Sequence, residues 1–441
     1  MPSFEQSIED VPLNSFHKRL ALSTSGSPFI DGYVLSIVGV IMSHLTDALS
    51  ISLFWEGLIA AAALIGLFFG GFLGGWFTDR FGRKLLYVID IIAIVGISIA
   101  QFWVDSVWLL FVLRLLIGIA VGADLPIATS LLAEFLPRKA RGPLLASMVV
   151  MWFAGAALAY VVGEFLLRMG GPDAWRWVLV SAAVPGLLLL VPRLKTPESA
   201  RWLISKGRVA EADAIIKRVY GPDYSVEDLS EPANQKKASV FSLFHSGYGK
   251  RMVFVTLFWT CSIVPLFAIY AFAPKVLQAL SLSDGWASFG SIAITSLFVV
   301  GCLVATKAIN AMGRRRMVIH SLLWSGLALA LLGIFPDASP VYVLILFGAY
   351  AVFIGGAQVL QYVYPNELFP TEIRASGVGL ATSLSRIGAA AGTYLVPVSL
   401  ASLGIGNTML IAASISLFGA LISWWLAPET SKLSLQQAAA L

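Results

Sequence analysis

The chain has 441 residues, of which 58% are hydrophobic and only 12% are charged. The apolar residues come in about a dozen blocks of membrane-spanning length instead of at amphipathic intervals, which excludes a soluble globular domain and predicts an integral membrane protein. A net charge of +5 would suggest an acidic partner for a soluble protein, whereas here the positions of the charges determine topology.

The apolar blocks are too long and too continuous for barrel strands, which have about ten residues and alternate apolar with polar side chains. We therefore expect an all-α membrane protein of twelve transmembrane helices. The predicted spans are 20–48, 55–77, 85–104, 107–134, 144–168, 174–194, 252–280, 286–308, 317–336, 339–368, 376–402 and 406–427.

Three polar segments flank or interrupt these spans. Residues 1–19 lack the basic, then apolar, then small-residue layout of a cleavable signal peptide, so they are expected to stay as a tail. Residues 195–251 contain "SARWLISKGRVAEADAIIKRVYG", whose apolar residues at helical spacing predict amphipathic helices under the bundle. Residues 428–441 form the second tail.

The charges of the connections alternate along the chain. "TDRFGRK", "LPRKARG", the 195–251 segment and "GRRR" are basic, whereas most of the intervening connections carry acids and almost no Lys or Arg. The positive-inside rule then predicts that the basic connections and both tails are cytoplasmic.

An internal repeat divides the spans into two halves of six. "DRFGRK" matches "NAMGRRR", "AEFLPRKARG" matches "NELFPTEIRASG", and "PESARW" matches "PETSKL", all at an offset of 231 to 233 residues. Residues 20–194 and 252–427 are therefore expected to be two pseudo-symmetric halves joined by a cytoplasmic linker.

The repeated motifs resemble those of the major facilitator superfamily over essentially the whole chain. "GGWFTDRFGRK" is similar to its loop signature, "RLLIGIAVG" to its fourth-helix signature, and "PESARWL" to the sixth-helix ending of one branch. That branch contains sugar porters, organic-anion and organic-cation transporters, phosphate/proton symporters and synaptic-vesicle-glycoprotein-like carriers. The resemblance implies alternating access around a site near the bilayer midplane, and leaves the substrate open.

The resemblance also implies a gate of ion pairs that closes the cytoplasmic side and separates when the carrier opens inward. The alternative is that these charges only set topology and are worth little when exposed. Asn310 replaces the expected acid in the second half, which predicts a weaker latch there. The matching residues are Asp79, Arg80, Arg83, Glu134, Arg141, Glu198, Arg314, Glu367, Arg374 and Glu429.

Charges inside the spans indicate a functional site, because an intramembrane charge is costly and faces a cavity or a partner. Asp31 lies about eleven residues into the first span, which is ~16 Å from its cytoplasmic start. Asp124 and Arg386 lie at a similar depth, ~15 Å, in the fourth and eleventh spans. Arg114 lies another ~15 Å toward the outside, so it is less plainly their partner.

The repeat assigns the acids to the first half and the midplane cation to the second. We expect Asp31 and Asp124 to carry protons, with Arg114 as an associated cation. In the second half we expect Arg386 to bind substrate, since arginine suits bidentate carboxylate recognition. The other substrate-binding candidates are Gln358, Gln361, Trp152 and Tyr270.

The resemblance bears on these roles. "GADLPIATSLLAEF" and "DGY" are similar to the fourth and first helices of phosphate/proton and organic-acid carriers, which supports Asp124 and Asp31. Val34 occupies the place of the sugar porters' first-helix acid, and the seventh span lacks the acid of phosphate symporters. Arg386 in "SLSRIGAA" resembles the eleventh-helix arginine of organic-anion transporters.

Structural roles remain open for the same residues. Arg386 could neutralise Asp31 or Asp124 as a buried pair, and Arg114 could bind backbone carbonyls. Each aromatic candidate could be ordinary packing, because aromatic residues make up 12% of the chain.

The sequence thus predicts a proton-coupled importer of a small organic anion, an aromatic or other monocarboxylate. The alternatives are a carrier of a neutral sugar, polyol or organic cation, and a non-transporting sensor with the carrier fold. No nucleotide-binding loop, zinc-ligand set or nucleophile triad occurs, and Cys261 and Cys302 lie in apolar spans, so we expect neither an enzyme nor a cofactor. We expect a monomer in a bacterial inner membrane whose partners are the substrate, protons and lipid, without nucleic acid.

Overall fold

The computed structural model describes residues 8, 11–229, 248–280, 282–369 and 371–431. Within these ranges the side chains at 72, 75, 76, 79, 133, 138–143, 146, 284 and 371–376 lie outside the description. The membrane helices of the first half are α1 (Ser15–Leu49), α2 (Leu53–Phe81), α3 (Arg83–Ala100), α4 (Val107–Phe135), α5 (Arg138–Gly170), α6 (Ala174–Ser181) and α7 (Ala183–Leu194). The last two, α6 and α7, together form one span, Ala174–Leu194. Those of the second half are α11 (Gly249–Ala279), α12 (Asp284–Met312), α13 (Arg314–Ile334), α14 (Pro340–Leu368) and α15 (Thr371–Leu426).

The described chain is almost entirely helical, with the membrane-spanning architecture that the apolar blocks predict. Eleven candidate spans are long and apolar enough to cross a membrane. The last of them, Gly377–Leu426, has 50 residues, or ~75 Å of helix, more than twice the ~30 Å of a hydrocarbon core. It is interrupted at Gly404, whose φ of 77° is outside the helical region, so it supplies two spans and brings the total to the expected twelve.

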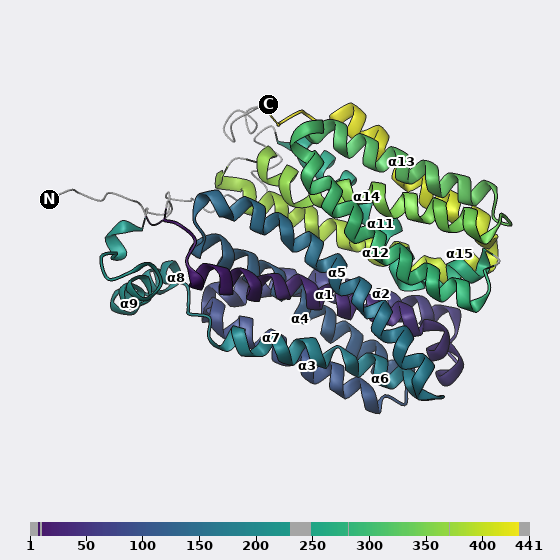
Figure 1. Cartoon of the computed structure of the whole chain (residues 1–441), viewed down its shortest axis with the longest axis horizontal. Coiled ribbons are helices and arrows are strands. Elements are labelled where there is room, and N and C mark those ends of the chain that lie inside the picture. The colour runs from purple at the N-terminus through teal and green to yellow at the C-terminus, as the bar shows by residue number, and fades with distance from the viewer. Residues whose placement is uncertain (1–7, 9–10, 230–247, 281, 370, 432–441) are drawn as a thin grey trace.

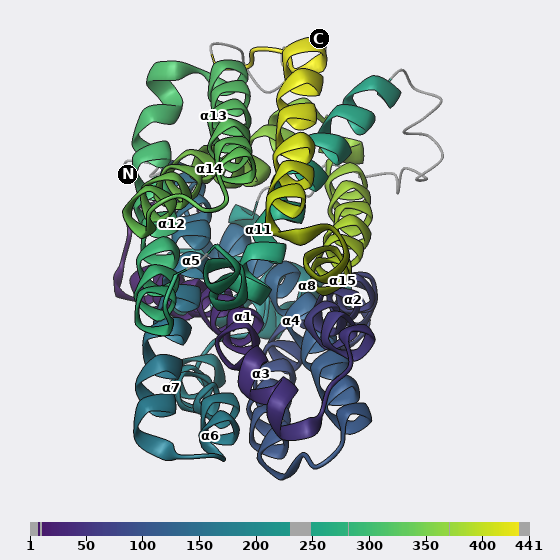
Figure 2. The same ribbon diagram turned by 90° about the vertical axis from the view of Figure 1, so that its right-hand side faces the viewer.

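The two halves lie side by side as separate groups of helices (Figures 1 and 2), with α1–α7 in one and α11–α15 in the other. Contacts between them are made mainly by α2 with α15, α5 with α12 and α1 with α11. The side of the bundle where α1 begins and α15 ends carries Arg80, Arg83 and Arg314, and we call it the basic side.

Glycines on α2 allow a close approach to α4 within the first half. A Cβ placed at Gly66 or Gly70 would lie 2.2 or 2.1 Å from the carbonyl oxygens of Leu115 and Ile119 on α4. Such a contact is impossible for a larger residue, so the glycine spacing of α2 sets how near α4 can pack.

The linker helices α8 (Ala200–Ser205) and α9 (Val209–Tyr220) dock on the basic side of the first half. Asn14 Nδ2 donates to the carbonyl of Val219 at 2.7 Å, and the Tyr220 hydroxyl donates to the carbonyl of Phe135 at 2.9 Å. The helix α9 is therefore attached to the ends of α1 and α4.

Candidate functional site

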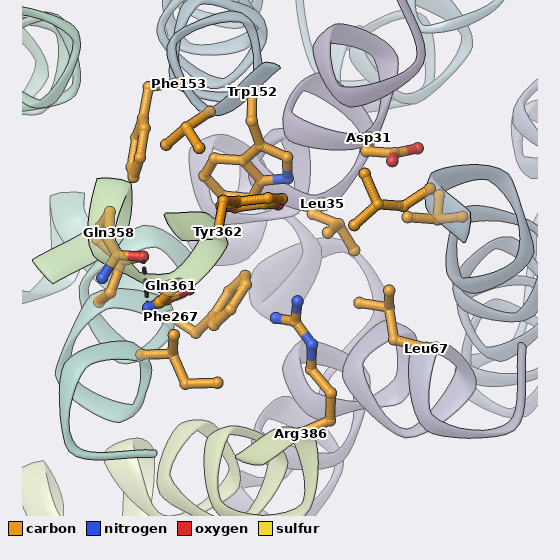
Figure 3. A pocket seen from close by; sticks show the side chains of 15 residues that line it. Asp31, Leu35, Leu67, Trp152, Phe153, Phe267, Gln358, Gln361, Tyr362 and Arg386 are labelled. Atoms are coloured by element: carbon orange, nitrogen blue, oxygen red, sulfur yellow. Dashed lines mark hydrogen bonds between the residues drawn. The ribbon is translucent and has the colours of Figure 1, made fainter. Parts of the chain in front are cut away.

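A cavity lies between the two halves near the middle of the bundle. Its walls come from α1, α2, α4 and α5 on one side and from α11, α14 and α15 on the other (Figure 3). The space open to the centre of a water-sized sphere is about 50 Å³. One water needs roughly 10–15 Å³ by this measure, so this space holds a few waters.

Asp31 and Arg386 bring opposite charges to this cavity from opposite halves. Asp31 is 3% exposed, and its Oδ1 accepts no hydrogen bond from a described residue. Arg386 makes no ion pair with a described carboxylate; its guanidinium carbon lies 5.6 Å from the centroid of the Phe267 ring. In Figure 3 the guanidinium group points toward the middle of the cavity. Both side chains therefore lie at the cavity without an ion pair to a described residue.

Gln358 and Gln361 line the cavity from α14 and are tied to Ser262 on α11. Gln361 Nε2 donates to Ser262 Oγ at 2.7 Å and to Gln358 Oε1 at 3.0 Å, and Gln358 Nε2 donates to the carbonyl of Ser262 at 3.3 Å. The pair is thus a preformed polar wall of the second half.

Aromatic rings form the rest of the wall. Trp152, Phe153, Phe267 and Tyr362 line the cavity. Tyr270 does not line it: it is 2% exposed and packs edge-on against Trp152, with ring centroids 5.6 Å apart. Of the two aromatic candidates from the sequence, the structure places Trp152 at the cavity and Tyr270 behind it.

Asp124 is paired with Arg193, a cation from the end of the sixth predicted span. Arg193 Nη2 lies 2.7 Å from Asp124 Oδ2, and Arg193 Nη1 lies 2.7 Å from Asp90 Oδ1. Ser27 joins the cluster, donating to Asp124 Oδ1 at 3.1 Å and accepting from Arg193 at 2.8 Å. The guanidinium carbon stacks 4.0 Å from the Tyr87 ring. Arg193 thus binds α1, α3 and α4 together from α7.

This cluster corrects the expected geometry of Asp124. Asp124 matches Asp31 in depth, but it is fully buried within the first half and does not line the cavity with Arg386. Asp90 in "YVIDIIAI" gives the same signal as Asp31, an acid within an apolar run, and could have been found. The sequence did not indicate a buried role for Arg193, because an arginine at the end of a span is ordinarily explained as a charge that sets topology.

Arg114 is buried and donates from Nη1 to the carbonyl of Val34 at 3.0 Å. This is the backbone-binding arrangement that the sequence left open as an alternative. The contact ties α4 to α1 beside the position where sugar porters carry an acid.

The repeated glutamates of the basic side cap helices. Glu198 Oε1 accepts from the backbone N–H of Arg83 at 2.9 Å, and Glu429 Oε1 accepts from the backbone N–H of Arg314 at 3.0 Å. Each carboxylate therefore lies at the positive N-terminus of a helix, α3 or α13. Gly82 permits the first contact, since its φ is 99° and a Cβ there would lie 2.4 Å from Glu198 Oε2.

These hydrogen bonds also affect the acidity of Glu429. Partial burial by itself raises the pKa of this carboxyl, but backbone N–H donors from Ser431, Arg314 and Arg315 hold it below its ordinary value. The carboxylate is thus kept ionised in its capping role at neutral pH.

The remaining described gate residues pair within one half. Arg83 forms an ion pair with Glu134, and Arg314 Nη2 lies 3.0 Å from Glu367 Oε1. Arg80 at the end of α2 is exposed and has interactions of its own. The side chains of Asp79, Arg141 and Arg374 lie outside the described residues. No ion pair among the described gate residues joins the two halves, so their separation during opening stays a prediction.

Two described contacts between the halves lie on the side opposite the basic side. Pro274 on α11 has no N–H to bond the carbonyl four residues earlier, that of Tyr270. The hydroxyl of Tyr160 on α5 donates to this freed carbonyl at 2.6 Å. One residue beyond Pro274, Lys275 Nζ lies 2.6 Å from Glu56 Oε1 on α2. The cavity is therefore shut from this side by bonds across the interface.

The comparisons with known proteins agree with this architecture. A family model described as "Sugar (and other) transporter" matches residues 11–441. The chain belongs to this family. It is a multi-pass membrane transporter of the major facilitator superfamily and not an enzyme.

Relatives of this transporter extend over nearly its whole length. The putative metabolite transport protein YaaU of Escherichia coli K12 is 43% identical over 433 residues, covering 98% of this chain and 96% of YaaU. The inner membrane metabolite transport protein YgcS of the same strain is 38% identical, covering 97% and 95%. A structure of the E. coli xylose transporter XylE, in a partially occluded inward-open conformation, matches with a TM-score of 0.82 at 22% identity, covering 96% of this chain and 100% of XylE. That likeness concerns the fold alone.

Proposed function

We propose that this transporter imports a small organic anion, an aromatic or other monocarboxylate, together with protons. The observation that carries the proposal is Arg386, a guanidinium that lines the central cavity without a described carboxylate partner. A planar guanidinium is suited to bind a carboxylate through two parallel hydrogen bonds. The aromatic wall of Trp152, Phe267 and Tyr362 would hold the apolar body of the solute.

Proton coupling follows from the charges that share the cavity. In the empty site the charge of Arg386 compensates that of an ionised Asp31 across the interface. A substrate carboxylate bound to Arg386 neutralises that cation and removes its compensating charge from the buried Asp31, which favours the uptake of a proton by Asp31. Binding of the anion and of the proton then favour one another, and the two dissociate together on the other side.

The assignments of the other residues belong to the same proposal. Asp124 is proposed to act in proton coupling through its contact with Arg193, and Arg114 as a cation that fixes α1 beside Asp31. Gln358, Gln361 and Trp152 are proposed to contact substrate, with Tyr270 supporting Trp152 from behind. The charged residues of the basic side are proposed to form the inner gate. We further propose that both termini are cytoplasmic, in a bacterial inner membrane, and that the carrier works as a monomer of two rocking halves.

A second candidate is a carrier of a neutral sugar or polyol. It is favoured by the family's description and by the likeness to XylE, which is described as a proton:xylose symporter. The amide wall of Gln358 and Gln361 could bind hydroxyl groups. Against it, a neutral solute would offer no opposite charge to the Arg386 guanidinium, which lines the cavity without an ion pair to a described carboxylate.

Replacing Arg386 separates the two candidates. Arg386→Gln should abolish the saturable uptake of anions, while Arg386→Lys, which keeps the charge but loses the planar fork, should retain uptake with a raised KM. Uptake would be measured in proteoliposomes with labelled benzoate, lactate, gluconate and xylose. Saturable xylose uptake that is unaffected by Arg386→Gln, without uptake of any anion, would select the sugar carrier.

A further inference from the structure

The hydrogen bonds around Ser262 fix which atom of each glutamine is oxygen and which is nitrogen. Ser262 Oγ donates its single proton to the carbonyl of Trp259 at 2.8 Å, so a group approaching that oxygen from elsewhere must be a donor. Gln361 approaches it at 2.7 Å, which assigns the Nε2 of Gln361 to this contact. The carbonyl of Ser262 likewise requires a donor, which is Gln358 Nε2 at 3.3 Å.

The network uses both amide protons of Gln361. One goes to Ser262 Oγ and the other to Gln358 Oε1 at 3.0 Å. The Oε1 of Gln361 accepts no hydrogen bond from a described residue, although the side chain is only 5% exposed and lines the cavity. A carbonyl oxygen in such a place needs a donor, either water or a bound solute.

Gln361 cannot rotate to offer its nitrogen to the cavity without losing two hydrogen bonds. An exchange of the amide atoms would set its oxygen against the Gln358 oxygen and against a hydroxyl whose proton is already engaged. The cavity therefore presents an acceptor fixed by hydrogen bonds, Gln361 Oε1, on α14, and a side chain that can only donate, Arg386, on α15. This combination favours a solute that carries both a carboxylate and a hydroxyl group over one that carries only a carboxylate.

We propose that the substrate is a hydroxylated monocarboxylate, such as a hydroxy acid or a sugar acid, and that Gln361 is the residue that selects for its hydroxyl group. The proposal rests on the function proposed above, because Arg386 places the carboxylate. The hydroxyl donates to Gln361 Oε1, replacing the water that satisfies this oxygen in the empty site. An unsubstituted acid of the same size displaces that water without replacing its hydrogen bond and binds less tightly.

The test uses ligands that differ by one kind of group, with binding measured as thermal stabilisation of the purified full chain over a concentration series. The six-carbon set is gluconate, hexanoate and sorbitol; the three-carbon set is lactate, propionate and 1,2-propanediol; the aromatic set is 3-phenyllactate, 3-phenylpropionate and 3-phenyl-1,2-propanediol. In at least one set we expect the hydroxy acid to bind about tenfold or more tightly than the unsubstituted acid.

Two variants test whether Gln361 is the residue that selects for the hydroxyl group. Gln361→Leu removes the acceptor and should bring the two acids of the set to within about twofold of each other. Ser262→Ala removes the contact of Gln361 with Ser262 Oγ, but Gln358, still held by the backbone carbonyl of residue 262, keeps the Gln361 amide in the same orientation, so this variant should retain the preference for the hydroxy acid. If Gln361→Leu keeps the preference, or Ser262→Ala loses it equally, Gln361 is not the selecting residue.

The ligand sets also separate this inference from the function on which it rests. Equal binding of the hydroxy and unsubstituted acids overturns the inference and leaves the anion carrier standing. Binding of the diol or polyol in preference to both acids overturns the anion carrier while the acceptor role of Gln361 survives. Stabilisation by none of the nine compounds overturns the proposed substrate class.

Discussion

The ion pair between Glu56 and Lys275 is expected to hold the carrier shut on the side opposite the basic side. The pair joins α2 of the first half to α11 of the second, with Nζ and Oε1 2.6 Å apart. Opening of that side must separate the two helices at this point, so the pair is present in one state and absent in the other. Glu56→Gln should therefore shift the equilibrium toward the state open on that side.

The size of this shift follows from the burial of the pair. The Glu56 side chain is 3% exposed and that of Lys275 is 26% exposed. Removing one partner of a fully buried pair costs roughly 3–5 kcal/mol, whereas an exposed pair contributes less than about 1 kcal/mol. For one buried and one partly exposed partner we take about 2 kcal/mol, which corresponds to a roughly thirtyfold change in the ratio of the two states.

A cysteine at Leu35 reports this equilibrium, because Leu35 lines the cavity and the native Cys261 and Cys302 are buried. If the basic side is cytoplasmic, as proposed above, a membrane-impermeant thiol reagent added to intact cells should label Leu35→Cys faster when Glu56 is replaced by glutamine, by up to about thirtyfold.

The controls test whether the pair itself is responsible. The exchanged variant Glu56→Lys with Lys275→Glu should label slowly again, since it restores an ion pair. Glu164→Gln, which breaks a local pair with Arg168 on one helix, should leave the rate unchanged. Unchanged labelling in Glu56→Gln at equal expression, or fast labelling in the exchanged variant, would refute the reasoning.

Three further predictions concern residues of the first half. Asp31→Asn should preserve substrate exchange across proteoliposomes but abolish accumulation driven by a pH gradient; continued uphill uptake would remove Asp31 from coupling. Arg193→Gln leaves Asp90 and Asp124 without their buried cation and should destabilise the protein by roughly 3–5 kcal/mol, seen as a lower Tm, with partial recovery on adding Asp90→Asn. An unchanged Tm would contradict the ionised cluster. Gly82→Ala should lower the Tm because of its positive φ and the Glu198 carboxylate, whereas Gly96→Ala, with open space around it, should not; equal effects would argue against the cap.

The fold could be predicted from the sequence because span length and loop charge are local properties. Apolar blocks of about twenty residues dictate helices, and the repeated motifs locate equivalent helix ends. At the end of the chain the two predicted spans 376–402 and 406–427 are joined by a tight turn at Gly404, whose φ of 77° is not helical. Local sequence does not reveal how the chain turns there.

The candidate site was predictable only in part, because its assembly depends on pairs from distant segments. An acid or arginine in an apolar block identifies a polar site, and this signal found Asp31 and Arg386. The same signal could not predict that Asp124 forms an ion pair with Arg193, which lies 69 residues later in the chain. Glu56 and Lys275 were also missed, since charges at span ends are ordinary and only the packed halves bring them together.

The most direct test of the central claim is to measure substrate and proton entry together. Purified protein in liposomes would be given labelled gluconate, lactate or benzoate under an inward proton gradient, with a pH-sensitive dye inside. The account predicts that at least one anion accumulates above its external concentration, that the interior acidifies with it, and that Arg386→Gln loses both. Anion or sugar flux that is indifferent to the gradient, with no accompanying proton entry, would contradict it.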